Sequence, residues 1–265
     1  MRLFLLMRFW SVFIALYLGD FMERIDYVND SLKLIQKTDG LTFGTDALLL
    51  AGYISGKYKN ALEIGSGTGI ISMLLLTREK AVRAVAVEVQ EEFSALIERN
   101  AELNGLSNRL EARLSDIRDF RAEAEFDLIY TNPPYMKVDS GKSCEMDKKN
   151  IARHEVLGDI RDFCLAAKRL LKFGGTFAVV YRPDRLSDLM AAMREARLEP
   201  KRITFVHADA ESESSMVLIE AKAGGKCGTI LTRPLIIYKD RSHSEYSEDM
   251  KYIMENGAFP PKYKR

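Results

Sequence analysis

The chain has 265 residues, of which 47% are hydrophobic and 29% charged, a balance typical of a globular protein with one large core. The net charge of +1 does not by itself indicate a nucleic-acid-binding protein. The three cysteines are far apart, and neither they nor the three histidines show metal-ligand spacing, which argues against a disulfide framework and a metal site and fits a reducing cytoplasm.

The N-terminus carries an apolar run over residues 9–18, preceded by Arg2 and Arg8. This pattern resembles the core of a signal peptide and is short for a membrane-spanning helix. No small-x-small cleavage site follows it, and a polar segment begins after Met22. We expect residues 1–21 to be an over-extended start or a hydrophobic leader, with Met22 as the functional start and no stable membrane partner. A genuine anchor or signal is the alternative.

Strand and helix patterns alternate over residues 59–240, which predicts a doubly wound, mainly parallel sheet. A short helix precedes this region at residues 47–53, capped by Thr45 and Asp46. Another helix is expected to be closed by Gly174 and Gly175. The expected strands are 61–64, 82–89, 110–114, 126–130 and 176–181, the other helices are 70–76, 91–104, 159–171 and 184–197, and residues 203–207 and 216–221 form a final antiparallel pair.

The segment from Glu63 to Gly69 reads E-I-G-S-G-T-G and follows the first strand. Glycines at Gly65, Gly67 and Gly69 let the chain turn sharply into a helix and leave bare backbone for a ligand to pack against. The dinucleotide fingerprint needs a further small residue at position 70, which is Ile70. The segment therefore predicts a different cofactor-binding turn, although many glycine turns bind nothing.

Acidic residues follow the next two strands. Glu88 ends the second strand, where a carboxylate can accept hydrogen bonds from both ribose hydroxyls of a nucleoside. Asp116 follows the third strand and can accept from an adenine amino group, with Asp119 as a nearby competitor. A solvated strand-end charge and a helix cap are the structural alternatives.

The turn Asn132-Pro133-Pro134-Tyr135 follows the fourth strand, at the sheet edge where ligands bind in open α/β folds. An amino group conjugated to a ring or carbonyl is a poor nucleophile because its lone pair is delocalised. The Asn132 side-chain oxygen and the Pro133 carbonyl can accept its two N–H groups and direct its lone pair towards a methyl donor. Tyr135 offers a ring on which a planar substrate can stack. A plain surface turn is the alternative.

In this order the motifs resemble class I methyltransferases that modify adenine N6, cytosine N4 or glutamine N5, and more narrowly the bacterial tRNA-valine adenine-N6 methyltransferases. The resemblance spans about residues 23–246 and also rests on the segment Gln36–Ala51 and on Arg153-His154-Glu155. It implies a Rossmann-like sheet of seven strands with one antiparallel edge strand, and S-adenosyl-L-methionine as cofactor. It divides the chain into a leader (1–21), a segment covering the cofactor (22–58), the methyltransferase domain (59–240) and a basic tail (241–265).

The same resemblance places further residues near the ligands. Phe43, Thr45 and Asp46 are expected beside the methionine moiety, and Asn132 beside the cofactor as well as the substrate. Arg153 and His154 are expected to hold a substrate phosphate, although a solvated helix entry is equally compatible with them.

The expected substrate is an adenine in tRNA. Residues 222–265 carry nine Lys or Arg against five Asp or Glu, which is compatible with a polyanionic partner, and Lys262 and Lys264 are candidate tRNA contacts. A release-factor glutamine methyltransferase shares the Asn-Pro-Pro-Tyr turn, but the short segment before the first strand disfavours it. A DNA adenine methyltransferase and a non-enzymatic RNA-binding module are the remaining alternatives.

Overall fold

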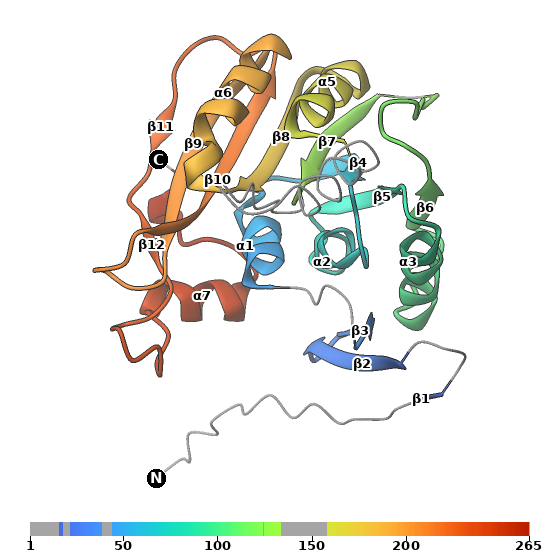
Figure 1. Cartoon of the computed structure of the whole chain (residues 1–265), viewed down its shortest axis with the longest axis horizontal. Helices are drawn as coiled ribbons and strands as arrows, with labels where there is room; N and C mark the ends of the chain where they lie inside the picture. Colours follow the sequence, from blue (N-terminus) through green and yellow to red (C-terminus); the bar gives the residue numbers. More distant parts are fainter. Residues whose placement is uncertain (1–15, 18–21, 39–43, 124, 134–157, 265) are drawn as a thin grey trace, which may run out of the picture.

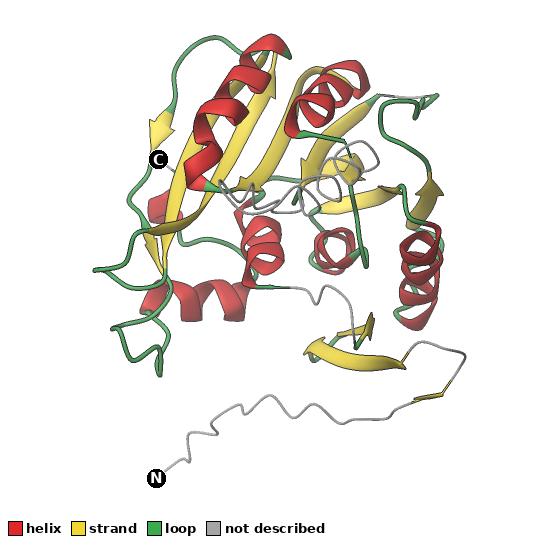
Figure 2. Ribbon diagram, viewed as in Figure 1, coloured by secondary structure: helices red, strands yellow, loops and turns green. Residues whose placement is uncertain are grey.

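The computed structural model describes residues 16–17, 22–38, 44–123, 125–133 and 158–264 (Figures 1 and 2). The predicted site residues Phe43, Tyr135, Arg153 and His154 lie outside these ranges. In the described ranges, no helix has the length and apolar character needed to cross a membrane.

Within the described residues, nine strands form the central sheet, in the order β11-β9-β10-β8-β7-β4-β5-β6, with β12 also paired to β9. Strands β4 to β8 are parallel to one another, and β10 is antiparallel to both β8 and β9. The strands are β4 (Tyr58–Ile64), β5 (Ala81–Glu88), β6 (Leu110–Leu114), β7 (Phe126–Thr131), β8 (Leu171–Tyr181), β9 (Leu198–His207), β10 (Ser214–Ala223), β11 (Ile230–Leu231) and β12 (Leu235–Ile236).

This topology confirms the doubly wound, mainly parallel fold and corrects two details. The sheet has nine strands in the described part of the chain, not seven, because β11 and β12 extend the outer edge of β9. Each is two residues long, too short to produce a periodic pattern. The antiparallel strand β10 lies between β8 and β9 and not at the edge, because the chain makes a hairpin from β9 back into the sheet.

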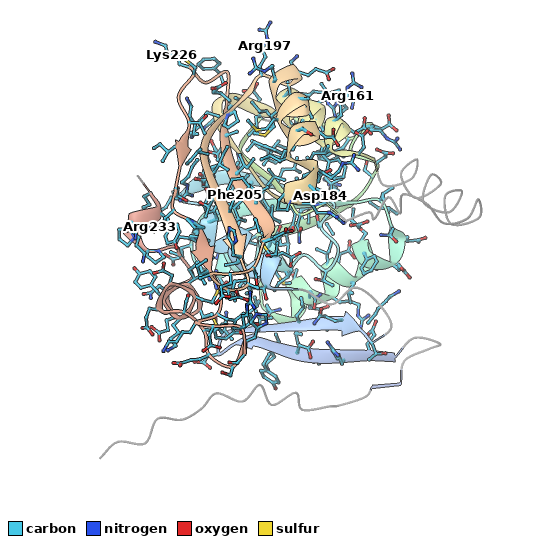
Figure 3. The ribbon with its side chains drawn as sticks, turned by 60° about the vertical axis from the view of Figure 1, so that its left-hand side comes forward. Arg161, Asp184, Arg197, Phe205, Lys226 and Arg233 are labelled. Carbon is cyan, nitrogen blue, oxygen red and sulfur yellow. The ribbon has the colours of Figure 1, made fainter. Side chains whose placement is uncertain are left out.

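The parallel strands all end at one edge of the sheet, and this edge carries the glycine turn, Glu88, Asp116 and Asn132. Strand β10 begins there because it runs opposite to β8. Figure 3 shows the separation of the two edges: Arg197, just before β9, and Lys226, beyond the end of β10, lie at the top, and Asp184, which follows β8, lies below them. We call the edge at which β4 to β8 end the carboxyl edge.

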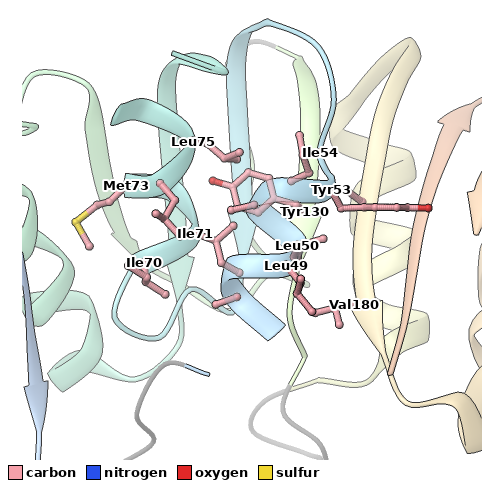
Figure 4. Packing of buried hydrophobic residues seen from close by; sticks show 14 of the residues in the cluster. Leu49, Leu50, Tyr53, Ile54, Ile70, Ile71, Met73, Leu75, Tyr130 and Val180 are labelled. Carbon is pink, nitrogen blue, oxygen red and sulfur yellow. The ribbon is translucent and has the colours of Figure 1, made fainter. Parts of the chain in front are cut away.

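Helices cover both faces of the sheet (Figure 1). On one face, side chains of α1, α2, α3 and α7 join one hydrophobic cluster with sheet residues such as Tyr130. Figure 4 shows Tyr130 between Leu50 of α1 and Leu75 of α2. On the other face, α5 and α6 pack on residues such as Ile129. Both faces of the central strands β7 and β8 are therefore buried, which explains their apolar runs, whereas the edge strand β6 is largely exposed.

The helices begin and end close to the predicted positions. Asp159 caps α5 through a reciprocal pair of hydrogen bonds with Asp162. Gly174 and Gly175 do not close this helix: it ends at Leu170, and the glycines lie inside β8. The helices are α1 (Thr45–Tyr53), α2 (Ile70–Thr77), α3 (Glu91–Leu103), α5 (Ile160–Leu170), α6 (Leu186–Glu195) and α7 (Glu248–Asn256), with short 3₁₀ turns η1 (Pro183–Arg185) and η2 (Pro261–Tyr263).

The N-terminal residues form a separate antiparallel sheet of β1 (Leu16–Tyr17), β2 (Met22–Asn29) and β3 (Leu32–Lys37). Strand β3 docks on α3 through Asn100 and Asn104, whose side-chain amides bond to its backbone N–H and C=O groups. The amide of Asn100 also donates to the carbonyl of Thr68. The hairpin is therefore tied to the glycine turn.

The C-terminal segment is an ordered part of the fold, whereas its composition suggested a basic tail. Met250 and Ile253 of α7 are buried, as are Phe259 and Tyr263. Arg202, in the middle of β9, donates to the carbonyl of Tyr263 and holds the end of the chain against the sheet.

Candidate active site at the carboxyl edge

The register of the central strands brings the predicted motifs side by side. Ile64 of β4 pairs with Val87 of β5 on one side and with Thr131 of β7 on the other. Gly65 therefore lies between Glu88 and Asn132 at the carboxyl edge. The chain continues from β4 to β5 and β6 in one direction, and β7 and β8 lie in the other, so this is the topological switch point where ligands bind in open α/β sheets.

The glycine turn adopts a backbone that favours glycine. Gly65, Gly67 and Gly69 have φ angles of 66°, 54° and 77°. A Cβ added to Gly65 or Gly67 would meet no atom within 4 Å, whereas one on Gly69 would approach Ile97 of α3 at 3.2 Å. Gly65 and Gly67 therefore leave open space for a ligand, and Gly69 allows α2 to pack closely on α3.

Glu88 supports the same turn. One carboxylate oxygen accepts the N–H of Gly67 at 2.9 Å, and the other accepts the N–H groups of Val89 and Gln90 at 3.0 Å. The side chain is held next to the turn, and the oxygen that accepts only the Gly67 N–H retains capacity for a further donor such as a ribose hydroxyl.

Glu63 lies beneath the turn and contacts α2. Its carboxyl is 2% exposed and accepts from the backbone N–H and the hydroxyl of Ser72, and that hydroxyl also bonds to the Tyr130 hydroxyl. Burial raises the pKa of Glu63 to about 8. The geometry shows Glu63 joining β4, α2 and β7 and does not show it facing the open side of the turn.

Replacing Glu63 with glutamine is expected to stabilise the protein at alkaline pH. Because burial raises the pKa of the folded-state carboxyl from 4.5 to about 8, the folded protein binds this proton more tightly than the unfolded chain. The free energy of unfolding therefore falls as pH rises between these two values, and this loss is complete above the higher one. Glutamine keeps an acceptor for Ser72 and does not titrate.

Chemical denaturation of both proteins across this pH range measures the effect. The difference in unfolding free energy should shift in favour of Glu63→Gln as pH rises. A difference that stays constant with pH would show that Glu63 does not titrate as its burial implies.

Asp116 lies just after β6, and Arg118 donates hydrogen bonds to its carboxylate. Its carboxylate accepts from the backbone N–H and the guanidinium of Arg118, which lowers the pKa of Asp116. An adenine amino group at this carboxylate would share it with Arg118. Asp119, the competing candidate, is exposed.

Asn132 follows β7, and its amide has one partnered and one unpartnered end. The nitrogen donates to Oδ2 of Asp46 at 2.9 Å. The oxygen Oδ1 is buried and has no hydrogen-bond partner in the part of the chain that the structure describes. Pro133, the next residue, is buried as well. Buried side-chain oxygens normally have a donor, so this oxygen is a candidate acceptor for a donor brought by a substrate.

A cavity of about 810 Å³ opens at the carboxyl edge and is lined by Asp46, the hydrogen-bond partner of Asn132. Among the described residues, neither Asn132 nor the glycine turn lines it. Thr45 and Asp46, at the start of α1, line one side of it. The N-terminal cap of α1 is Gly44 and not the predicted Thr45-Asp46 pair. The remaining lining residues follow β8, directly precede β10 or begin it, and they were not recognised in the sequence, since they form no motif: Arg182, Pro183, Asp184, Glu213, Ser214, Ser215 and Met216.

The structure does not bring Lys262 and Lys264 to this edge. Lys262 pairs with Asp249 at 2.5 Å. Burial, the largest cause, and nearby cations that include Lys264 together lower the pKa of Lys80 to about 7. Lys80 directly precedes β5, so Lys264 lies towards the opposite edge, where the parallel strands begin.

Three supporting residues were missed in the sequence. Ser72 and Tyr130 complete the network under the turn, and Asn100 holds the Thr68 carbonyl. The sequence signal that could have identified them is a polar side chain at a position where the helix or strand pattern predicts burial. Asn100 and Asn104, four residues apart on one helix face, are the clearest example.

Comparison with known proteins agrees with this geometry. The family model of the methyltransferase small domain matches residues 37–196. A protein of Phocaeicola vulgatus named tRNA1(Val) (adenine(37)-N6)-methyltransferase is 37% identical over 68% of this chain and 76% of its own length. A protein of the same name from Parabacteroides distasonis is 28% identical over 68% of this chain and 76% of its own length.

A solved structure from Agrobacterium tumefaciens, described as a predicted O-methyltransferase, shares the fold. It superposes with a TM-score of 0.65 at 22% identity and covers 81% of this chain and 98% of its own.

Proposed function

Because the chain belongs to the methyltransferase small domain family and, within it, to the group of the tRNA1(Val) (adenine(37)-N6)-methyltransferases, we propose that it transfers a methyl group from S-adenosyl-L-methionine to the N6 amino group of an adenine in tRNA. The observation that carries the proposal is the side-chain oxygen of Asn132, which has no partner among the described residues and lies one strand away from the glycine turn. We propose the cytoplasm, where tRNA is modified, as the place of action.

The residues at the carboxyl edge fit this cofactor. Gly65 and Gly67 offer open backbone, and Glu88 offers to a ribose hydroxyl the oxygen that accepts only the Gly67 N–H. When bound, S-adenosyl-L-methionine supplies an electrophilic methyl group on a sulfonium. We propose that the methionine moiety lies beside Thr45 and Asp46, which line a cavity at the same edge of the sheet.

Asn132 meets the chemical demand of an amino group on a ring. The N6 lone pair is delocalised into the adenine, so the nitrogen must lose part of this conjugation before it attacks. An oxygen that accepts one N–H, together with the Pro133 carbonyl for the other, favours the tetrahedral arrangement and orients the lone pair. The product loses its proton readily to water, so no general base is required.

The target base must be unpaired or turned out of its stack, because a paired adenine cannot present its amino group in such a turn. We propose that Tyr135 stacks on the base and that Arg153 and His154 hold a phosphate, although these three residues lie outside the described ranges. Phosphate contacts predict tRNA binding that weakens as salt concentration rises.

Transfer of radiolabelled methyl groups tests the proposal. Total tRNA, DNA and release factor are offered in parallel, and labelled RNA is digested for nucleoside mass spectrometry. We expect label in tRNA as N6-methyladenosine. Label on a protein glutamine without N6-methyladenosine would refute the RNA substrate and leave the chemistry of the turn in place, because a glutamine amide is also planar and conjugated.

A further inference from the structure

We infer that Asp46 is a positioning residue whose carboxylate sets the orientation of the Asn132 amide, and that Gly44 is glycine because this carboxylate needs its space. The inference rests on the proposed methyl transfer at Asn132 and goes beyond it. It assigns Asp46 a role towards the substrate acceptor, in addition to its expected place beside the cofactor.

The position of Asp46 favours a negative charge. Asp46 lies in the first turn of α1, where the helix dipole stabilises an anion. Its Oδ1 accepts the N–H of Ala47 at 2.9 Å, and no side chain caps this helix. An ionised carboxylate here has only acceptor oxygens to offer.

The Asp46 carboxylate, which can only accept hydrogen bonds, fixes which end of the Asn132 amide faces it. A primary amide can turn by half a rotation and exchange its oxygen for its nitrogen. Only the NH₂ end can bond to an acceptor, and it lies 2.9 Å from Oδ2 of Asp46. In the other orientation two oxygens would face each other and repel. The oxygen Oδ1 of Asn132 is therefore held as the end that has no donor among the described residues, although leaving a buried acceptor without a donor is unfavourable.

The fixed orientation matters because the two ends of the amide have opposite chemistry. An oxygen can accept an N–H group of the substrate. An NH₂ in its place would meet the substrate's own N–H groups with no acceptor. Asp46 thus turns a side chain with two possible orientations into one with a defined acceptor, before the substrate arrives.

Gly44 gives an independent reason to connect these residues. Its φ is −107°, which any residue can adopt, so the backbone does not require glycine. A Cβ at position 44 would instead lie 2.6 Å from Oδ1 of Asp46. A side chain at Gly44 must displace the carboxylate. The two oxygens of one carboxylate therefore connect these residues: Oδ1 occupies the space beside Gly44, and Oδ2 accepts from Asn132.

The test compares Asp46→Asn and Gly44→Ala with the unchanged protein. The first keeps the shape of the side chain and removes its purely accepting character, and the second keeps the carboxylate and displaces it. We expect kcat to fall by at least about tenfold in each, as for other residues that orient a functional group. The KM for tRNA and the Kd of the cofactor should change much less.

Glu248→Gln is the matched control. It also removes a carboxylate from the first turn of a helix, α7, where the side chain is 79% exposed and pairs with Lys239 and Lys251. The control should keep its kcat. A loss of cofactor affinity in Asp46→Asn with unchanged kcat would overturn the inference and make Asp46 a cofactor ligand alone.

A second measurement does not depend on activity. The NH₂ signals of Asn132 can be identified in a ¹⁵N-correlated NMR spectrum as the pair that disappears in Asn132→Ala. These signals should shift in Asp46→Asn and stay in place in Glu248→Gln. Unmoved signals in Asp46→Asn would refute the contact. If the label of the transfer assay goes to a protein glutamine, the tRNA proposal fails, but the kcat comparison can be repeated on that substrate.

Discussion

Replacing Asn132 with alanine should abolish methyl transfer and leave cofactor binding largely intact. The variant removes the one buried side-chain oxygen that has no partner in the described part of the chain, and with it the acceptor for the reacting amino group. Loss of a single preorganised group aimed at the reacting atoms typically lowers kcat by about 100- to 1,000-fold. The loss should appear in kcat and in kcat/KM alike, because the interaction develops with the reaction.

Single-turnover transfer and calorimetry with the cofactor measure the two halves of this prediction. Asn108→Ala is a suitable control, since Asn108 is exposed and precedes β6 at the opposite edge of the sheet. Transfer at the normal rate by Asn132→Ala would remove Asn132 from the reaction. A parallel loss of cofactor affinity would instead assign it to the cofactor.

Replacing Glu88 with alanine should weaken cofactor binding by at least tenfold, which corresponds to about 1.4 kcal/mol. Two effects add in this variant. The ribose hydroxyls lose their acceptor, and the N–H of Gly67 loses the carboxylate that holds it at 2.9 Å. The turn can then relax away from the shape that receives the ligand.

Calorimetry on the folded variant checks this result, with circular dichroism to confirm the fold. Glu88→Gln should have an intermediate effect, because its amide keeps one oxygen and presents an NH₂ where the second oxygen accepted an N–H. Glu111→Ala, an exposed acid on β6, is the control. Unchanged affinity in Glu88→Ala would exclude Glu88 from the site.

Local patterns were sufficient to predict the central sheet and the order of the motifs. Strands buried on both faces, such as β7, produce apolar runs. The edge strand β6 was also predicted at the residues that the structure shows, Leu110–Leu114. Gly65 and Gly67 were recognisable because left-handed backbone favours glycine. Parallel strands end at one edge, so the motifs after β4, β5 and β7 had to meet there.

Segments without a periodic core face were not predictable in this way. The N-terminal hairpin, β11, β12 and α7 are stabilised by docking on other elements of the chain. For example, the backbone of β3 bonds to the side-chain amides of Asn100 and Asn104. The basic composition of the last residues indicated a tRNA contact, but charge carries no information about which edge of the sheet a segment reaches. In the folded protein Lys264 lies near Lys80, just before β5, and therefore at the edge of the sheet opposite Asn132.

The sequence by itself determined the chemistry of this protein: a glycine turn, an acid after the next strand and an asparagine before two prolines. It did so because each motif depends on the conformation of a few consecutive residues. Only the tertiary structure decided which groups support them. Glu63 turns to Ser72 beneath the turn, and the Asn132 amide is oriented by Asp46, 86 residues earlier in the chain. Such contacts depend on the packing of α1 and α2 against the sheet, which no local pattern encodes.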